Sequence, residues 1–227
     1  MPELTIRPST KRNALTLMVA GLALSLLSIF ARLLLELPPV FFMAGVVLGV
    51  LLLVLGVAKN TEPEASLVIT PENIRYLQRR GQWTLAWEHI QRFDIPRIER
   101  GMEYVDMPFL GIRLNQYGPL VHSLSQRLAV HLLMEQRPLL VAALRYASVE
   151  PDDYAKYFNT PERFKDEFGE RYQGIQASFA YRMAQYRELL GYDLFIPETA
   201  LDREPHEFKA YLKELQHKRA IFYPPHR

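Results

Sequence analysis

The apolar residues of this chain are concentrated in two long stretches near its N-terminus. Residues 14–31 form an uncharged run of eighteen residues, and residues 37–58 form a second run of twenty-two. As α-helices they would be roughly 27 and 33 Å long, which matches the hydrocarbon core of a bilayer. Helices satisfy their own backbone hydrogen bonds, so both segments are stable in lipid. The pattern therefore predicts a transmembrane helical hairpin over residues 14–58.

Two other interpretations of these stretches are less consistent with the pattern. A secretory signal peptide has an apolar region of about 7–15 residues followed by a cleavage site of small residues. Here the first run is longer and is followed almost at once by a second one. A buried hairpin of a soluble protein would need a large surrounding core, and the remaining sequence looks self-sufficient.

The basic residues that flank the two runs predict their orientation. They are Arg7, Lys11 and Arg12 before the first run, Arg32 between the runs, and Lys59, Arg75, Arg79 and Arg80 after the second. Basic residues accumulate on the cytoplasmic side of membrane proteins. We therefore expect a two-span protein of the bacterial inner membrane with both termini in the cytoplasm.

Small residues recur at helical spacing in both runs. Gly45 and Gly49 form a GxxxG pair with Gly56 seven residues later, and Gly21 and Ser25 form a similar pair in the first run. Small residues let helix backbones approach closely. They predict either packing of the two spans on each other or homodimerisation through the Gly45 face.

From Ser66 the apolar positions alternate with the period of β-strands. A helix follows, N-capped by Ser123 or Ser125, running to Tyr146 with a kink near Pro138. We expect this helix to close an open end of the sheet. The predicted strands cover 67–69, 74–76, 83–87, 90–95, 109–114 and 120–122.

After Ser148 the pattern is helical. We expect a short helix over 151–158, a long one from the N-cap Thr160 to a C-terminal signal at Gly191, and a last one over 205–219. The predicted fold is thus α+β. Its parts are a tail (1–13), the hairpin (14–58), a linker (59–65), a β domain with its closing helix (66–147) and a helical region (148–227).

Two segments of the predicted β domain carry a resemblance to a known fold. The run Leu67–Tyr76 (LVITPENIRY) and the run Trp83–Ile90 (WTLAWEHI) resemble bacterial pleckstrin-homology-like domains, which often follow a two-helix membrane hairpin. Asn73 stands where that pattern commonly has Gly, and both residues tolerate turn conformations. The resemblance implies a small antiparallel PH-like barrel that binds lipid, peptide or protein. The whole chain, with the phrase Gly191–Arg203 (GYDLFIPETALDR), also resembles an uncharacterised family of two-span gammaproteobacterial membrane proteins.

Composition narrows the classes of function. Removing the four basic and two acidic residues up to Ala58 from the totals of 27 and 25 leaves 23 of each, so the region after the hairpin is neutral. Nucleic-acid-binding domains usually have a basic excess, so we expect no nucleic acid as partner. The chain has no cysteine, which excludes disulfides, thiol nucleophiles and Cys-ligated zinc. No catalytic or nucleotide-binding motif occurs, and the six histidines lack metal-ligand spacing. We expect no cofactor and no metal.

Two acidic groups could still bear chemistry. Glu150, Asp152 and Asp153 could bind a divalent cation, although carboxylates at a helix N-terminus also favour its dipole. Asp193, Glu198, Asp202 and Arg203 lie in a loop that could line a site, and loop-fixing ion pairs explain them equally well.

A more specific hypothesis concerns three basic residues, Arg75, Arg79 and Arg80. They lie on a predicted hairpin a few residues after the second span, and basic residues near an anionic leaflet contribute about 1 kcal/mol each. This hairpin either docks on anionic lipid headgroups or is an ordinary solvated turn.

These observations favour a non-enzymatic inner-membrane protein whose cytoplasmic module binds a protein partner or anionic lipid. Two other classes remain open. One is an enzyme acting on a membrane-proximal substrate, with the acidic loops as its site. The other is a structural homo-oligomer assembled through the GxxxG helix.

Overall fold

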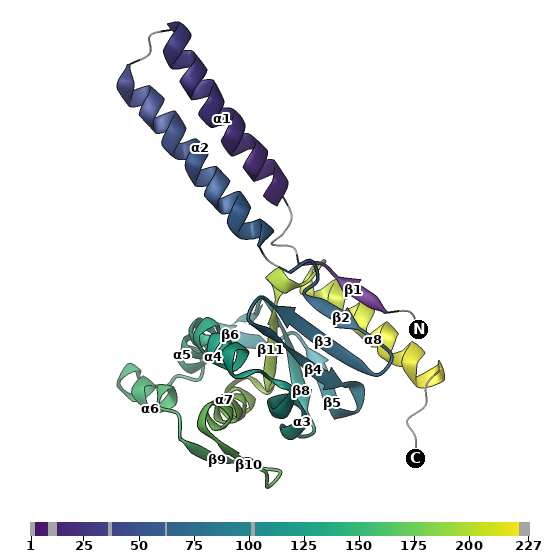
Figure 1. Cartoon of the computed structure of the whole chain (residues 1–227). Helices are drawn as coiled ribbons and strands as arrows, with labels where there is room; N and C mark the ends of the chain where they lie inside the picture. Colours follow the sequence, from purple (N-terminus) through teal and green to yellow (C-terminus); the bar gives the residue numbers. More distant parts are fainter. Residues whose placement is uncertain (1–2, 9–12, 36–37, 62, 101–102, 223–227) are drawn as a thin grey trace. The chain divides into compact units, whose positions relative to one another are not determined.

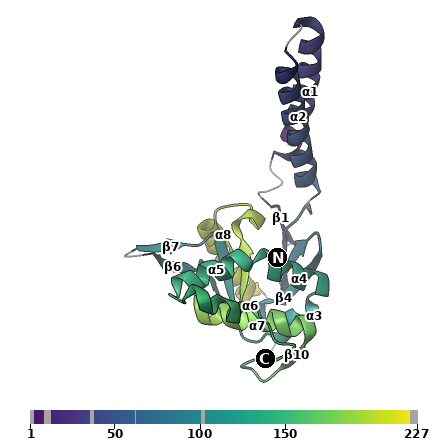
Figure 2. The same cartoon turned by 90° about the vertical axis from the view of Figure 1, so that its left-hand side faces the viewer.

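The computed structural model describes residues 3–8, 13–35, 38–61, 63–100 and 103–222. They form two compact units: a hairpin unit, Pro8–Glu64, and an α/β unit built from Met1–Arg7 and Ala65–Arg227 (Figures 1 and 2). The chain is thus a mixed helix and sheet protein with two apolar helices near its N-terminus, then antiparallel sheets, then helices.

The hairpin unit consists of α1 (Ala14–Leu35) and α2 (Pro39–Asn60), which pack on each other. Both helices are long and apolar enough to cross a membrane. Their outer faces are apolar and uncovered, since Leu15 is 74% and Val40 73% exposed.

Small residues set the distance between α1 and α2. A Cβ on Gly21 would lie 2.6 Å from the carbonyl oxygen of Gly49, and one on Gly56 would lie 2.9 Å from the backbone nitrogen of Met18. Ser25 contacts Gly49 and donates its hydroxyl hydrogen bond to the carbonyl of Gly21 at 2.9 Å, so it presents no unpaired polar group. The small residues therefore lie between the two helices of one chain.

The α/β unit contains two larger antiparallel sheets. The first has the order β1-β2-β3-β4, formed by Leu4–Ile6, Leu67–Ile69, Asn73–Gln78 and Gly81–Ala86. The second has the order β11-β8-β5, formed by Leu194–Pro197, Phe109–Leu114 and Ile90–Asp94. Two ribbons of two strands complete the unit: β6 (Arg97–Arg100) with β7 (Glu103–Asp106), and β9 (Arg163–Lys165) with β10 (Arg171–Gln173).

The predicted barrel is wrong. The short 3₁₀ helix η2 (Trp87–His89) separates β4 from β5, and β5 pairs with β8 instead of continuing the first sheet. The indole of Trp87 donates to the carbonyl of Thr70 at 2.9 Å, which fixes this change of direction. The two sheets remain separate and share one core with several helices, in which Trp83 and Phe208 are fully buried.

Strand β1 lies in the segment predicted as a tail. Ile6 is opposite Leu67 and Leu4 is opposite Ile69 in an antiparallel pairing, and Ile6 is buried in the core. The hydrogen bond from Ser66 N to the carbonyl of Ile6 (2.9 Å) extends it. The hairpin unit is therefore an insertion between two neighbouring strands.

The remaining helices follow the predictions in most places. They are α3 (Gly118–Ser123), α4 (Gln126–Glu135), α5 (Arg137–Tyr146), η3 (Pro151–Asp153), α6 (Tyr154–Phe158), α7 (Gly174–Leu190), η4 (Glu198–Ala200) and α8 (Pro205–Phe222). The Ser125 hydroxyl caps α4, and Gly191 ends α7 with a φ of 77°, as predicted. The predicted helix over 125–146 is broken at Gln136, with Pro138 in the first turn of α5.

Two predicted elements are wrong. The strand expected at 120–122 is helix α3, which Pro119 can begin because its missing N–H is not needed in a first helical turn. The helix expected from Thr160 starts only at Gly174, because residues 163–173 form the β9–β10 ribbon. Asp166 Oδ1 accepts the backbone N–H groups of Phe168 (3.0 Å) and Glu170 (2.8 Å), and Gly169 adopts a φ of 95°, so the chain turns back there.

The packing of the hairpin unit gives a test with engineered cysteines, since the chain has none. A Cβ on Gly45 would lie 3.0 Å from the Cβ of Ser28, close to the spacing of about 3.5–4.5 Å in disulfides. We expect Ser28→Cys with Gly45→Cys to form a disulfide within one chain on mild oxidation in membranes, seen by mass spectrometry and non-reducing gels. The pair Leu26→Cys with Leu48→Cys, on exposed faces, should form none within the chain. A covalent dimer through Gly45→Cys alone would instead establish association between chains.

Candidate functional site

The three arginines of the lipid hypothesis lie on the first sheet. Arg75 is on β3 and binds Glu3 at 3.3 Å, while Arg79 and Arg80 form the exposed turn between β3 and β4. The register fixes where this turn lies. Leu67, the first residue of β2, is opposite Tyr76, and Leu77 N donates to the carbonyl of Ser66 at 2.7 Å. The turn therefore projects from the end of the sheet at which the chain passes to and from the hairpin unit.

The two predicted acidic groups do not form shared sites. Asp153 pairs with Lys156 at 2.7 Å on the surface, and Asp202 pairs with its neighbour Arg203 at 2.9 Å. Asp193 is buried and pairs with a different residue, Arg187. Among the described residues, no group of three or more histidines or carboxylates could hold a metal ion.

Asp193 instead belongs to a buried polar cluster that the sequence prediction missed. Its side chain is fully buried, and its oxygens accept Arg187 Nε at 2.5 Å, Arg187 Nη2 at 2.7 Å, the Tyr117 hydroxyl at 3.0 Å and the backbone N–H of Leu114 at 2.6 Å. Every strong acceptor direction of the carboxylate is thus used within the fold. The helix end at Gly191 is the one sequence signal that could have found the cluster, because it places Arg187 and Asp193 on either side of one turn.

Arg187 connects this cluster to the surface. Its guanidinium also donates to the carbonyl of Leu114 at 2.7 Å, pairs with Glu167 and lies 5.2 Å from the ring centres of both Tyr117 and Phe168. Burial lowers the pKa of Arg187, but the hydrogen bonds and charge of Asp193 outweigh it and raise the pKa above its ordinary value. Burial and the Asp193 carboxylate raise the pKa of Tyr117. Arg187 therefore stays charged and Tyr117 neutral at physiological pH.

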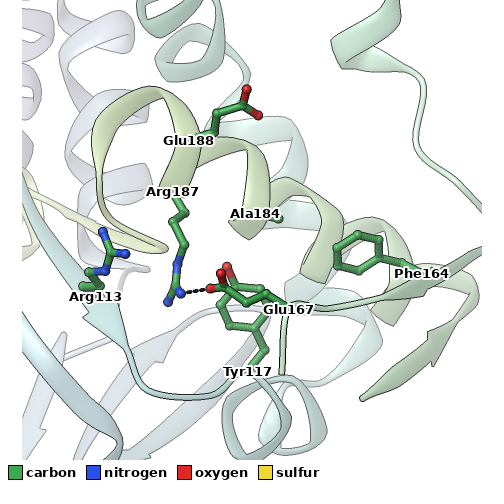
Figure 3. Close-up of a pocket in the computed structure, with 7 residues that line it drawn as sticks. All are labelled: Arg113, Tyr117, Phe164, Glu167, Ala184, Arg187 and Glu188. Atoms are coloured by element: carbon green, nitrogen blue, oxygen red, sulfur yellow. Dashed lines mark ion pairs between the residues drawn. The ribbon is translucent and has the colours of Figure 1, made fainter. Parts of the chain in front are cut away.

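A pocket of about 450 Å³ opens beside Arg187 (Figure 3). Its charged groups are two guanidinium groups and two carboxylates, and its remaining walls are aromatic or small. Within the described part of the chain, the Arg113 guanidinium makes one hydrogen bond, to the carbonyl of Gly191 at 3.3 Å. The lining residues are Arg113, Tyr117, Phe164, Glu167, Ala184, Arg187 and Glu188. Such a lining suits a small charged ligand held by ion pairs and ring contacts.

Taken together, the chain is a mixed helix and sheet protein that carries two helices able to cross a membrane and a charged surface pocket. It belongs to the DUF2982 family, described as proteins of unknown function, whose model matches residues 67–218. The match spans the α/β unit from β2 into α8. No curated protein and no solved structure matches the chain.

The Arg187–Asp193 pair gives a stability prediction. Arg187→Met leaves the Asp193 carboxylate buried without its counterion, so we expect the free energy of unfolding to fall by about 3–5 kcal/mol. Urea unfolding followed by tryptophan fluorescence measures this, because both tryptophans are buried in the α/β unit.

Glu167→Gln is the matched control. The Glu167 side chain is 54% exposed, so its loss should cost less than about 1 kcal/mol although it touches the same guanidinium. Equal losses from the two variants would show that the buried pair does not carry the stability.

Proposed function

We propose that this protein is a non-enzymatic binding protein of the bacterial inner membrane, with the hairpin unit as its anchor and the α/β unit in the cytoplasm. Three observations support the anchor. Helices of 22 residues are about 33 Å long, their outer faces are uncovered apolar side chains, and basic residues flank the outer ends of the hairpin. An apolar surface of this extent is stable in lipid and not in water.

The pairing of β1 with β2 supports a double crossing. Ile6 precedes the first helix and Leu67 follows the second, yet the two residues are opposite each other in one sheet. The chain therefore has to leave and re-enter the bilayer on the same side. A single crossing would place these two strands on opposite sides of the membrane.

The β3–β4 turn is the element we propose to bind anionic lipid, and its register is the observation that carries this proposal. Arg79 and Arg80 project from the end of the sheet at which the chain connects to both helices. Basic residues close to an anionic leaflet are attracted over about a Debye length, roughly 8–10 Å. This contact would orient the α/β unit.

Cysteine accessibility tests the topology. Asn13→Cys and Thr61→Cys lie just outside the two helices. We expect neither to react with a membrane-impermeant maleimide in intact spheroplasts and both to react after permeabilisation. Reaction of only one residue in intact spheroplasts would contradict the double crossing, and reaction of both would reverse the orientation.

Vesicle flotation tests the lipid contact. A soluble variant that retains β1, with a short Gly/Ser segment in place of residues 8–64, preserves the Ile6–Leu67 pairing. We expect it to float with vesicles containing phosphatidylglycerol and not with neutral vesicles. Arg79→Glu with Arg80→Glu should weaken this binding by about tenfold or more, since each basic residue contributes about 1 kcal/mol.

Lys165→Glu with Arg171→Glu, on the β9–β10 ribbon, is the charge-matched control and should leave vesicle binding unchanged. Circular dichroism of each variant checks that the fold is retained. Equal binding to neutral and anionic vesicles, or equal loss in both charge variants, would refute a role for the turn.

A further inference from the structure

The ribbon of β9 and β10 presents a block of cationic side chains to solvent. Its register places Arg171 opposite Lys165 and Gln173 opposite Arg163, and these four alternate with Phe164 and Tyr172. Successive strand residues point to opposite faces, so the four exposed side chains share one face. Tyr172 is buried, and the ring of Phe164 packs edge-on against that of Tyr181 with 5.4 Å between the ring centres. The two apolar side chains thus attach the ribbon to the unit and leave the cations outside.

The acidic residues of the same segment are held away from this face. Asp166 is buried and binds the Tyr172 hydroxyl at 2.9 Å as well as two backbone N–H groups. Glu167 pairs with Arg187, and Glu170 binds His122 at 2.8 Å and the Tyr172 hydroxyl at 3.0 Å. Three acidic and three basic residues make residues 163–173 neutral in composition, but the fold separates the two charges.

In the part of the chain that the structure describes, no carboxylate or carbonyl group pairs with the side chain of Arg163, Lys165 or Arg171. Like charges directly opposite each other destabilise a strand pair, so this arrangement is unfavourable until an anion binds. A hollow of about 430 Å³ lies on the ribbon, lined by these three cations with Phe164, Tyr172 and Gln173. Five of these six side chains carry a hydrogen-bond donor, and none of the six is acidic.

We propose that this face of the β9–β10 ribbon binds a small soluble molecule that carries two or more phosphate groups. Three cations on neighbouring positions of two paired strands match the charge of several phosphate groups. Arginine binds phosphate oxygens in a bidentate manner. The volume is that of a small-molecule site. Helix α7 begins at Gly174, directly after Gln173, and adds the positive end of a seventeen-residue helix beside the same corner.

A soluble ligand is favoured over a lipid by the place of the ribbon in the unit. β9 and β10 lie at the end of the α/β unit away from β1, the strand that leads into the first helix (Figures 1 and 2). A nucleic acid would contact a longer basic surface, whereas the region after the hairpin is neutral.

Isothermal titration of the full-length protein in neutral detergent with inorganic tripolyphosphate tests the proposal. We expect saturable binding of one tripolyphosphate per chain. Lys165→Gln with Arg171→Gln should weaken it by about tenfold or more through the loss of two charge-assisted contacts. Arg79→Glu with Arg80→Glu should leave it unchanged, and thermal unfolding of each variant checks the fold.

Competition separates the possible sources of phosphate. Phosphatidylglycerol vesicles and a single-stranded oligonucleotide should not displace tripolyphosphate, whereas pyrophosphate should. Displacement by vesicles would assign the face to lipid and displacement by the oligonucleotide to nucleic acid, and either result would overturn the proposal. So would absent binding or binding that the Lys165 and Arg171 variants do not weaken. The vesicle assay of the β3–β4 turn is independent of this result.

Discussion

The buried carboxylate of Asp193 binds groups from three different parts of the α/β unit: the Arg187 guanidinium of α7, the Tyr117 hydroxyl before α3 and the backbone N–H of Leu114 at the end of β8. An ionised carboxylate can be buried at this depth only if such partners replace its water. The pair therefore forces α7, the second sheet and the turn before α3 into one arrangement. The same guanidinium also pairs with Glu167, in the turn between β9 and β10. The wall of the pocket depends on this arrangement.

Local patterns predicted the elements whose stabilising interactions are themselves local. The apolar runs of α1 and α2, the alternation in β2 to β5, the Ser125 cap and the Gly191 end were all readable because each depends on neighbours within a few residues. The barrel could not be excluded in this way, because the pairing of β5 with β8 is set by contacts distant in sequence. The helix prediction for residues 163–173 was wrong for a related reason. Their apolar spacing suits a helix, but the Asp166 side chain and Gly169 stabilise a turn.

The candidate sites also divide into local features, which the sequence predicted, and features set by distant contacts, which it did not. The turn at Arg79 and Arg80 is contiguous in sequence and was predicted. Its position at the end of the sheet that connects to the hairpin unit follows only from the β2–β3 register. Arg187 and Tyr117 carried no sequence signal as a pair, since seventy residues separate them. Composition could not predict the cationic face of the ribbon, because the acidic and basic residues of 163–173 are equal in number. The charges separate only in the folded ribbon, where Lys165 is exposed and Asp166 is buried.

The position of strand β1 in the sequence also imposes an order on the folding of the first sheet. Ile6 leaves the ribosome before either apolar helix, but its partner Leu67 is synthesised only after both. The first sheet therefore cannot be completed until α2 has folded back beside α1. Before β1 pairs with it, the edge of β2 has unpaired backbone groups. Closing the β1–β2 pair brings the two ends of the hairpin unit together, so the first sheet is complete only in a chain whose α2 has folded back beside α1. A chain whose second helix failed to fold back would leave the backbone N–H and C=O groups of that strand edge exposed and able to pair with another chain.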